Sequence, residues 1–249
     1  MLQAARALGV VDEVLAPLPG ATGQTWAAGA YVLRVRPRRE LERELEACAA
    51  AAAVLPVPRA IDLVHLEAVS AVLLERLPGM AAGDLGALPP EEGRRRGLAC
   101  GRLHAALAEV VAPGGVPLAT NLVTTTGTDT PHEGDRLLHL DLHPFNVLVD
   151  DGGEVSGVVD WANASAGHPD LDRARSASIF TYDPAALARR ANPTWAAFAA
   201  GWEQAGGFSD LAASALVWAY RFMLADLGHR YRKDELSPLR AALDKLTMS

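Results

Sequence analysis

The segment HLDLHPFN, at residues 139–146, constrains the fold of this chain more than any other feature, because it places polar residues between two apolar runs. Residues 137–138 are leucines, and residues 147–149 are Val-Leu-Val. Polar groups that leave water cost free energy unless they find hydrogen-bond partners. The two histidines, the aspartate and the asparagine of this segment therefore form either a polar network that stabilises a turn or a functional site.

The residues after this segment predict a β-hairpin. Residues 146–149 and 154–161 are rich in strand formers, and the Asp-Asp-Gly-Gly sequence between them is a turn signal. A hairpin returns the end of its second strand to the start of its first. We therefore expect Asn146 and Asp160 to lie close together, with Asp141 nearby.

These three side chains suit the chemistry of phosphoryl transfer. The oxygens of Asn146 and Asp160 are ligands for a hard cation such as Mg²⁺, and Asp141 is then left as a base. Phosphoryl transfer also needs a cation on the phosphates. Kinases order these parts as a strand cation, a helix glutamate, an Asp and Asn five residues apart, and a later Asp. This chain has all five in that order, with Arg34 and Glu44 as the first two.

Arg34 and Glu44 fall on a strand and on the helix that follows it. Residues 31–35 predict the strand, and residues 37–55 predict the helix, which starts at a proline and is followed by one. At about 100° per residue, one apolar stripe of the helix contains Leu41, Leu45, Cys48, Ala52 and Leu55. Glu44 borders this stripe, so it is the acid of the helix best placed to reach into the protein. Two unrelated surface charges are the alternative.

Strands are expected early in the chain and helices late. Residues 60–77 predict two strands, residues 91–111 predict a helix weakened by its glycines, and residues 112–135 predict a loop. Residues 137–140 predict a short strand, and helices follow Pro169. This order predicts two lobes joined near residues 77–79.

The composition excludes several classes of protein. The chain has 249 residues, 50% of them hydrophobic and 21% charged, which is typical of a globular protein. Its net charge of −7 and scattered basic residues argue against nucleic acid as a partner. The longest apolar stretch is too short to cross a membrane, and the N-terminus lacks a signal-peptide pattern. Cys48 and Cys100 imply no disulfide framework. We expect a cytoplasmic protein with no membrane partner, as a monomer or homodimer.

The stretch HLDLHPFNVLVDDGGEVSGVVDWANASAGHPDLDRA resembles the catalytic loop and metal-binding Asp-Trp segment of the aminoglycoside phosphotransferase and choline kinase-like family of small-molecule kinases. YVLR followed by RE, and LLERLPG, resemble that family's nucleotide lobe and hinge, and the likeness covers residues 17–180. The resemblance implies an α+β, bilobal, protein-kinase-like fold. A small mixed N-terminal lobe with an antiparallel sheet would cover residues 1–77, and a larger, mainly helical lobe would cover residues 78–249.

The resemblance also implies a function, which is ATP- and Mg²⁺-dependent transfer of the γ-phosphoryl group to a hydroxyl of a small molecule. The acceptor would be an aminoglycoside-like antibiotic, an amino-alcohol or a sugar. Asp141 would be the catalytic base, and Asn146 and Asp160 would be the Mg²⁺ ligands. Arg34 would pair with the phosphates, and Glu44 would be its ion-pair partner.

The backbone from Glu75 to Leu77 would hold the adenine, and the loop from Gly20 to Gly23 would approach the phosphates. The chain departs from the family's pattern in two places. Arg34 stands where many relatives carry lysine, and a guanidinium binds phosphate with a different geometry. The glycine loop is short and does not match the G-x-G-x-x-G pattern of protein kinases.

We expect structural roles for four other polar residues. His139 and His143 would support the loop, Asp172 would cap a helix, and His104 would be a core-edge residue with its polar groups satisfied. Three acids of the late helices could meet a cationic acceptor or could be ordinary surface charges: Asp183, Glu203 and Asp226.

Three alternatives stay open at this point. The alternation His139-x-Asp141-x-His143 could be the metal triad of a hydrolase. The same lobes could form a nucleotide-binding pseudokinase or regulatory module without turnover. A protein kinase is the third alternative, although no D-F-G or A-P-E segment is recognisable.

Overall fold

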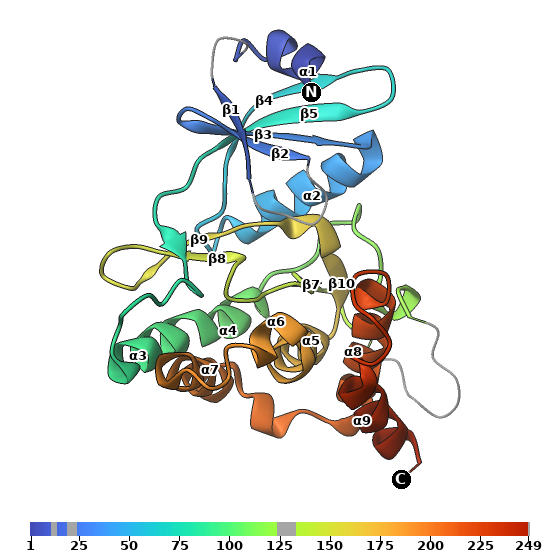
Figure 1. The fold of residues 1–249 in the computed structure, drawn as a ribbon. Coiled ribbons are helices and arrows are strands. Elements are labelled where there is room, and N and C mark those ends of the chain that lie inside the picture. The colour runs from blue at the N-terminus through green and yellow to red at the C-terminus, as the bar shows by residue number, and fades with distance from the viewer. Residues whose placement is uncertain (11–13, 19–23, 124–132, 249) are drawn as a thin grey trace.

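The computed structural model describes residues 1–10, 14–18, 24–123 and 133–248. An antiparallel sheet with helices α1 (Leu2–Ala7) and α2 (Arg38–Ala51) forms the N-terminal lobe, and a mainly helical lobe follows it (Figure 1). This arrangement confirms the predicted α+β class and its division into a small mixed lobe and a larger helical one.

The N-terminal sheet has five strands in the order β1-β2-β3-β5-β4. Their bounds are β1 Leu15–Pro17, β2 Thr25–Ala28, β3 Tyr31–Arg36, β4 Ala60–His65 and β5 Ser70–Glu75. Side chains alternate between the two faces of a strand. Leu33 of the central strand β3 packs in the cluster formed with α1, and Val32 packs in the cluster formed with α2. This alternation places Arg34, two residues after Val32, on the face that α2 covers.

Helix α2 joins the two lobes. Leu41 packs on the sheet, whereas Cys48 lies in a core cluster with Trp161 of the C-terminal lobe. The predicted end of this helix at residue 55 is wrong, because regular helix stops at Ala51 and Ala52 is exposed. The proline that follows Leu55 disfavours helical geometry there. Leu55 is still buried, but it reaches the core from a turn.

The chain crosses between the lobes after β5. Strand β6 (Met80–Ala81) already pairs with β8 (Val147–Val149) of the C-terminal lobe, so the crossing lies between Glu75 and Met80. The domain ranges 1–77 and 78–249, taken as separable units, stay a prediction.

The C-terminal lobe holds a bundle of helices beneath two small sheets (Figure 1). The sheets contain β7 Arg136–Leu138 with β10 Ser165–Gly167, and β6 and β8 with β9 Val155–Val158. The helices are α3 Pro90–Gly101, α4 Leu103–Leu107, α5 Pro169–Tyr182, α6 Pro184–Leu187, α7 Pro193–Gly206, α8 Ala213–Leu227 and α9 Ser237–Thr247. Short 3₁₀ helices are η1 Ala119–Asn121, η2 Trp161–Asn163 and η3 Phe208–Asp210. Within the described ranges, no helix has the length and hydrophobicity needed to cross a bilayer.

The hairpin of β8 and β9 is present as predicted, but other details differ. The predicted helix over 91–111 is divided at Arg102 into α3 and α4. The predicted strand over 137–140 ends at Leu138, and its partner β10 was not predicted. Part of the predicted loop over 112–135 lies outside the described residues.

The glycines of α3 allow it to pack directly against α7. A Cβ atom at Gly97 would lie 2.0 Å from the carbonyl oxygen of Phe198, and one at Gly101 would lie 2.6 Å from that of Trp202. The two helix backbones are therefore closer than any side chain at these positions allows. The residues that weaken the helical propensity of residues 91–111 are the ones that permit this contact.

Candidate active site

The β8–β9 hairpin brings together the polar residues at its open end. Val147 pairs with Val158, and the N–H of Val159 donates to the carbonyl of Asn146 over 2.9 Å. Asp160 follows with a left-handed backbone, at φ 63°, which turns the chain away from the strand. Asn146 and Asp160 are therefore neighbours, as the hairpin argument predicted.

Asp141 is held beside Asn146. The Nδ2 of Asn146 donates to the main-chain oxygen of Asp141 over 2.9 Å and to its Oδ2 over 3.2 Å. The carboxylate also lies 3.6 Å from Nε2 of His143 and 3.8 Å from a guanidinium nitrogen of Arg175. Burial alone raises the pKa of Asp141, but the nearby His143 and Arg175 outweigh burial and hold this pKa well below its usual range. Asp141 is thus an ionised carboxylate at neutral pH.

Arg34 pairs with two carboxylates, and its pair with Asp160 joins the two lobes. Its Nε lies 2.9 Å from Oε1 of Glu44 on α2, and a terminal nitrogen lies 2.7 Å from Oδ1 of Asp160. The side chains of Arg34 and Glu44 are only 9% and 8% exposed. Burial lowers the pKa of Arg34, but the two carboxylates raise it more, so the guanidinium stays charged. Burial raises the pKa of Glu44 to about 7, with Arg34 opposing the shift.

Asn146 and Asp160 fit a magnesium ion that takes its remaining ligands from water or phosphate oxygens. Because Nδ2 of Asn146 is used on Asp141, the amide oxygen of Asn146 is left for another ligand; no described residue donates to it. The side chain of Asp160 is 40% exposed, and among the described residues only its Oδ1 is bonded, to Arg34. Two hard oxygens suit Mg²⁺, which keeps several waters or phosphate oxygens.

His139 supports the loop of residues 139–146 through both ring nitrogens. The N–H of Asp141 donates to Nδ1 of His139 over 3.2 Å, so the other ring nitrogen, Nε2, carries the proton and donates to the carbonyl of Val159 over 3.0 Å. Burial lowers the pKa of His139 and keeps the ring neutral. Neither nitrogen can ligate a metal, and no group of three or more metal-ligating side chains is found in the described part of the chain. The metal-triad alternative is therefore contradicted.

Asp172 has a different role from the predicted helix cap. His168 is the N-cap of α5, whereas Asp172 is buried in the first turns of this helix and faces the loop. Its Oδ1 accepts from the N–H groups of His139 and Leu140, over 2.9 and 2.6 Å, and its Oδ2 lies 3.2 Å from Nδ1 of His104. His104 in turn accepts from the indole of Trp202 over 3.2 Å. His104 therefore has the structural role expected of it, because it holds Asp172, which in turn holds the loop of residues 139–146.

The hinge residues lie where the chain crosses between the lobes. The N–H of Glu75 donates to the carbonyl of Arg59 over 2.9 Å, which extends the pairing of β5 with β4 by one residue. Among the described residues, no partner is found for the N–H of Leu77. Gly20 and Gly23, the predicted phosphate loop, lie outside the described residues.

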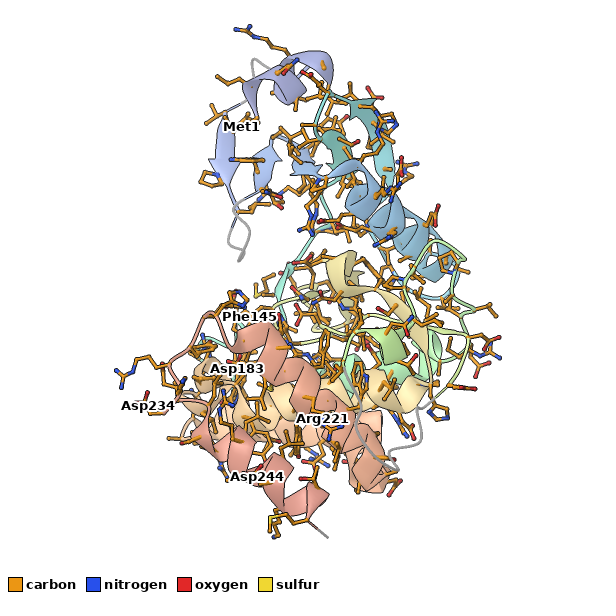
Figure 2. All side chains as sticks on the ribbon, turned by 90° about the vertical axis from the view of Figure 1, so that its right-hand side faces the viewer. Met1, Phe145, Asp183, Arg221, Asp234 and Asp244 are labelled. Atoms are coloured by element: carbon orange, nitrogen blue, oxygen red, sulfur yellow. The ribbon has the colours of Figure 1, made fainter. Side chains whose placement is uncertain are left out.

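A cavity of about 460 Å³ opens in front of Asp141 and Asp160. Phe145 lies near the edge of the C-terminal lobe that faces the N-terminal lobe, with Asp183 just below it in Figure 2. The cavity is lined by carboxylates and aromatic rings, among them Asp141, Asp160, Asp183, Asp226, Phe145 and Trp195. Cationic groups of Arg36, Arg175 and Arg230 also line it. Of the three acids considered for the acceptor, Asp183 and Asp226 reach this cavity, whereas Glu203 is exposed on α7.

Sequence reasoning did not single out Arg175. This side chain is buried, and it lies on α5 one turn after Asp172, so both face the loop of residues 139–146. The spacing of three residues was the available signal, because residues three apart share a helix face. This spacing identifies Arg175 only once it is known that α5 packs against residues 139–142.

The fold is shared with solved small-molecule kinases. An aminoglycoside-3′-phosphotransferase of type VIII is 21% identical, with a TM-score of 0.62 over 90% of this chain and 97% of that one. A thermostable mutant of the aminoglycoside phosphotransferase APH(4)-Ia, in a complex with ADP and hygromycin B, is 17% identical, with a TM-score of 0.63 over 100% and 98%. A Plasmodium vivax ethanolamine kinase is 11% identical, with a TM-score of 0.58 over 96% and 84%. The protein-kinase-like fold is therefore confirmed.

The family follows from the sequence comparison. A model of the phosphotransferase enzyme family matches residues 19–134 and 128–215, which is more than half of the chain. No curated protein sequence matches. The chain belongs to the phosphotransferase enzyme family, and it is an enzyme of the small-molecule kinase class.

Proposed function

We propose that the protein transfers the γ-phosphoryl group of ATP to a hydroxyl group of a small molecule in a Mg²⁺-dependent reaction. The observation that carries this proposal is the hairpin that sets Asn146 and Asp160 side by side, with the ionised Asp141 bonded to Asn146. Structures similar to this fold contain ADP or AMP-PNP, which supports a nucleotide as the phosphoryl donor.

Each residue of the site has a role in this reaction. Asp141 accepts a hydrogen bond from the acceptor hydroxyl, orients its oxygen towards the γ-phosphorus and takes its proton as the new P–O bond forms. Asn146 and Asp160 would hold Mg²⁺, which would supply positive charge against the phosphates. Arg34 lies against Asp160 and can bind phosphate oxygens with two N–H groups, and Glu44 fixes its direction.

The nucleotide base would lie against the hinge. The backbone of Glu75 to Leu77 would bind the adenine. The N–H of Leu77 has no partner among the described residues, so it is left to donate to the base. Gly20 and Gly23 would cover the phosphates. Burial of the apolar base between the lobes would then place the triphosphate towards Arg34.

The cavity suits an acceptor that carries hydroxyl groups and positive charge. Asp183 and Asp226 supply carboxylates, of which Asp226 is also paired with Arg175, and Phe145 and Trp195 supply flat apolar surfaces. Amino-alcohols and aminoglycoside-like compounds have this combination of groups. We therefore include both in the acceptor class, together with sugars.

Binding and turnover test the proposal separately. Thermal unfolding would be followed with MgATP for the parent, Asp160→Asn and Asp151→Asn, a control on the exposed turn of the same hairpin. MgATP should raise the Tm of the parent and of the control but not of Asp160→Asn. An acceptor screen would follow, with Asp141→Asn as the blank; this variant should bind MgATP but lose several orders of magnitude in rate. Binding without turnover on any acceptor or on water would indicate a pseudokinase.

A further inference from the structure

Arg175 is a buried guanidinium next to the catalytic loop. Only 1% of the residue is exposed. Its Nε donates to the carbonyl of Leu140 over 3.2 Å, and one terminal nitrogen donates to Oδ2 of Asp226 on α8 over 2.5 Å. The same terminal nitrogen lies 3.8 Å from Oδ1 of Asp141. One side chain of α5 therefore contacts the loop, the base and an acid of the cavity.

Leu140, the residue before Asp141, has an unusual backbone conformation. Its φ is 59°, in the left-handed region that is unfavourable for a residue with a Cβ atom. Both of its backbone polar groups are held by α5, since its N–H donates to Asp172 and its carbonyl accepts from Arg175. These bonds maintain the conformation from which the side chain of Asp141 projects into the cavity.

A purely stabilising ion pair with Asp226 explains these contacts less well. Burying a guanidinium is costly, and a pair of this kind often contributes no net stability. The remaining terminal nitrogen of Arg175, Nη1, is buried without a hydrogen-bond partner among the described residues. The carboxylate of Asp226 is still 31% exposed. The arrangement leaves one terminal nitrogen of Arg175 without a partner, but it fixes the backbone of Leu140.

We infer that Arg175 is a positioning residue for phosphoryl transfer, which acts by holding Leu140 and the carboxylate of Asp141 in their working geometry. This inference rests on the proposed function. The hydrogen bonds and ion pairs of Arg175 go to Leu140, Asp141 and Asp226 and to none of the residues proposed to hold MgATP, so we expect it to act on the rate and not on MgATP binding. It also connects the base to Asp226, a residue that lines the acceptor cavity.

A double-mutant cycle on the full-length protein tests the inference. The measured reaction is the hydrolysis of MgATP with water as acceptor, in which water attacks the γ-phosphorus, ADP leaves and Asp141 receives the proton. The variants are Arg175→Gln, Asp141→Ala and the combination of both. Arg173→Gln is the control, because Arg173 lies on the same helix but pairs with Asp170. Thermal unfolding with MgATP reports binding for each protein.

Arg175→Gln should lower kcat by about 100-fold, the effect of a misplacement near 1 Å, with an unchanged KM for MgATP. Arg173→Gln should have the parent rate. In the Asp141→Ala background, Arg175→Gln should cause no further loss, because its effect acts through Asp141. Losses that multiply, or an Arg175→Gln variant with the parent rate, would overturn the inference.

Arg175→Lys covers the case in which the glutamine variant does not fold. It keeps a positive charge opposite Asp226, but one ammonium group does not reproduce the two-point contact with Leu140 and Asp226. This variant should also lose rate at constant KM, and a parent-like rate would overturn the inference. A parent that neither binds nor hydrolyses MgATP would overturn the proposed function and this inference together. A parent that hydrolyses MgATP as fast as Arg175→Gln would overturn the inference alone.

Discussion

Substituting Asp172 by asparagine should destabilise the protein strongly, although the two side chains have nearly the same shape. Asp172 accepts from the N–H groups of His139 and Leu140, and it faces Nδ1 of His104. The indole of Trp202 donates to the other nitrogen of His104, so Nδ1 of this ring carries the proton. An asparagine oxygen can still serve the two backbone N–H groups, but its NH₂ group then faces the N–H of His104.

The cost can be worked out from these contacts. Hydrogen bonds to a charged acceptor contribute roughly 1 kcal/mol more than those to a neutral one, so two such bonds lose about 2 kcal/mol. The opposed N–H groups leave a buried donor unsatisfied, which adds about 1–3 kcal/mol. A change of ring tautomer gives no relief, because Trp202 would then face a second donor. The expected loss is about 3–5 kcal/mol, a large share of the roughly 5–15 kcal/mol that stabilises a typical protein.

Urea unfolding at neutral pH measures this loss directly. Asp170→Asn is the matched control, because Asp170 lies in the same first turn of α5 and pairs with Arg173 on the same helix, away from the loop of residues 139–146. It should lose no more than about 1 kcal/mol, as expected of a partly exposed pair. If Asp172→Asn also lost less than about 1 kcal/mol, the hydrogen-bond network assigned to Asp172, His104 and Trp202 would be refuted.

Two further predictions concern packing and pH. Gly97→Ala should lower the free energy of unfolding, measured in urea, by at least about 1–3 kcal/mol. The reason is that the new Cβ would meet the carbonyl oxygen of Phe198 at 2.0 Å. Gly114→Ala is the control, because no atom lies within 4 Å of a Cβ at that position. Burial raises the pKa of Asp172, but His104 and the backbone N–H groups outweigh it and lower that pKa below the ordinary aspartate value. A depressed folded-state pKa adds stability that is present above the unfolded value and is lost as the pH falls through the folded one. The stability difference between the parent and Asp172→Asn should therefore shrink as the pH falls below about 4, and a difference that stays constant would contradict this reasoning.

The parts of the site that could be predicted are those with local patterns. Turn chemistry and strand propensity determine the β8–β9 hairpin, and a hairpin has few ways to place the residues at its open end. Helical periodicity placed Glu44 at the edge of the buried stripe, and the structure buries it beside Arg34. In each case the relevant distance along the chain is short, or the geometry is that of one regular element.

The parts that could not be predicted depend on which elements pack together. Asp172 in the first turns of a helix has the sequence pattern of a capping residue, and only the position of α5 against residues 139–142 shows that it binds another segment. Arg175 is buried although arginine is usually exposed, because the carbonyl of Leu140 and the carboxylate of Asp226 converge on it from two other elements. Leu140 has no sequence signal for a positive φ, which is most common for glycine and asparagine. Its conformation is imposed from outside by α5. The working geometry of Asp141 is therefore a tertiary property, and substitutions in α5 should test it more sharply than substitutions in the loop itself.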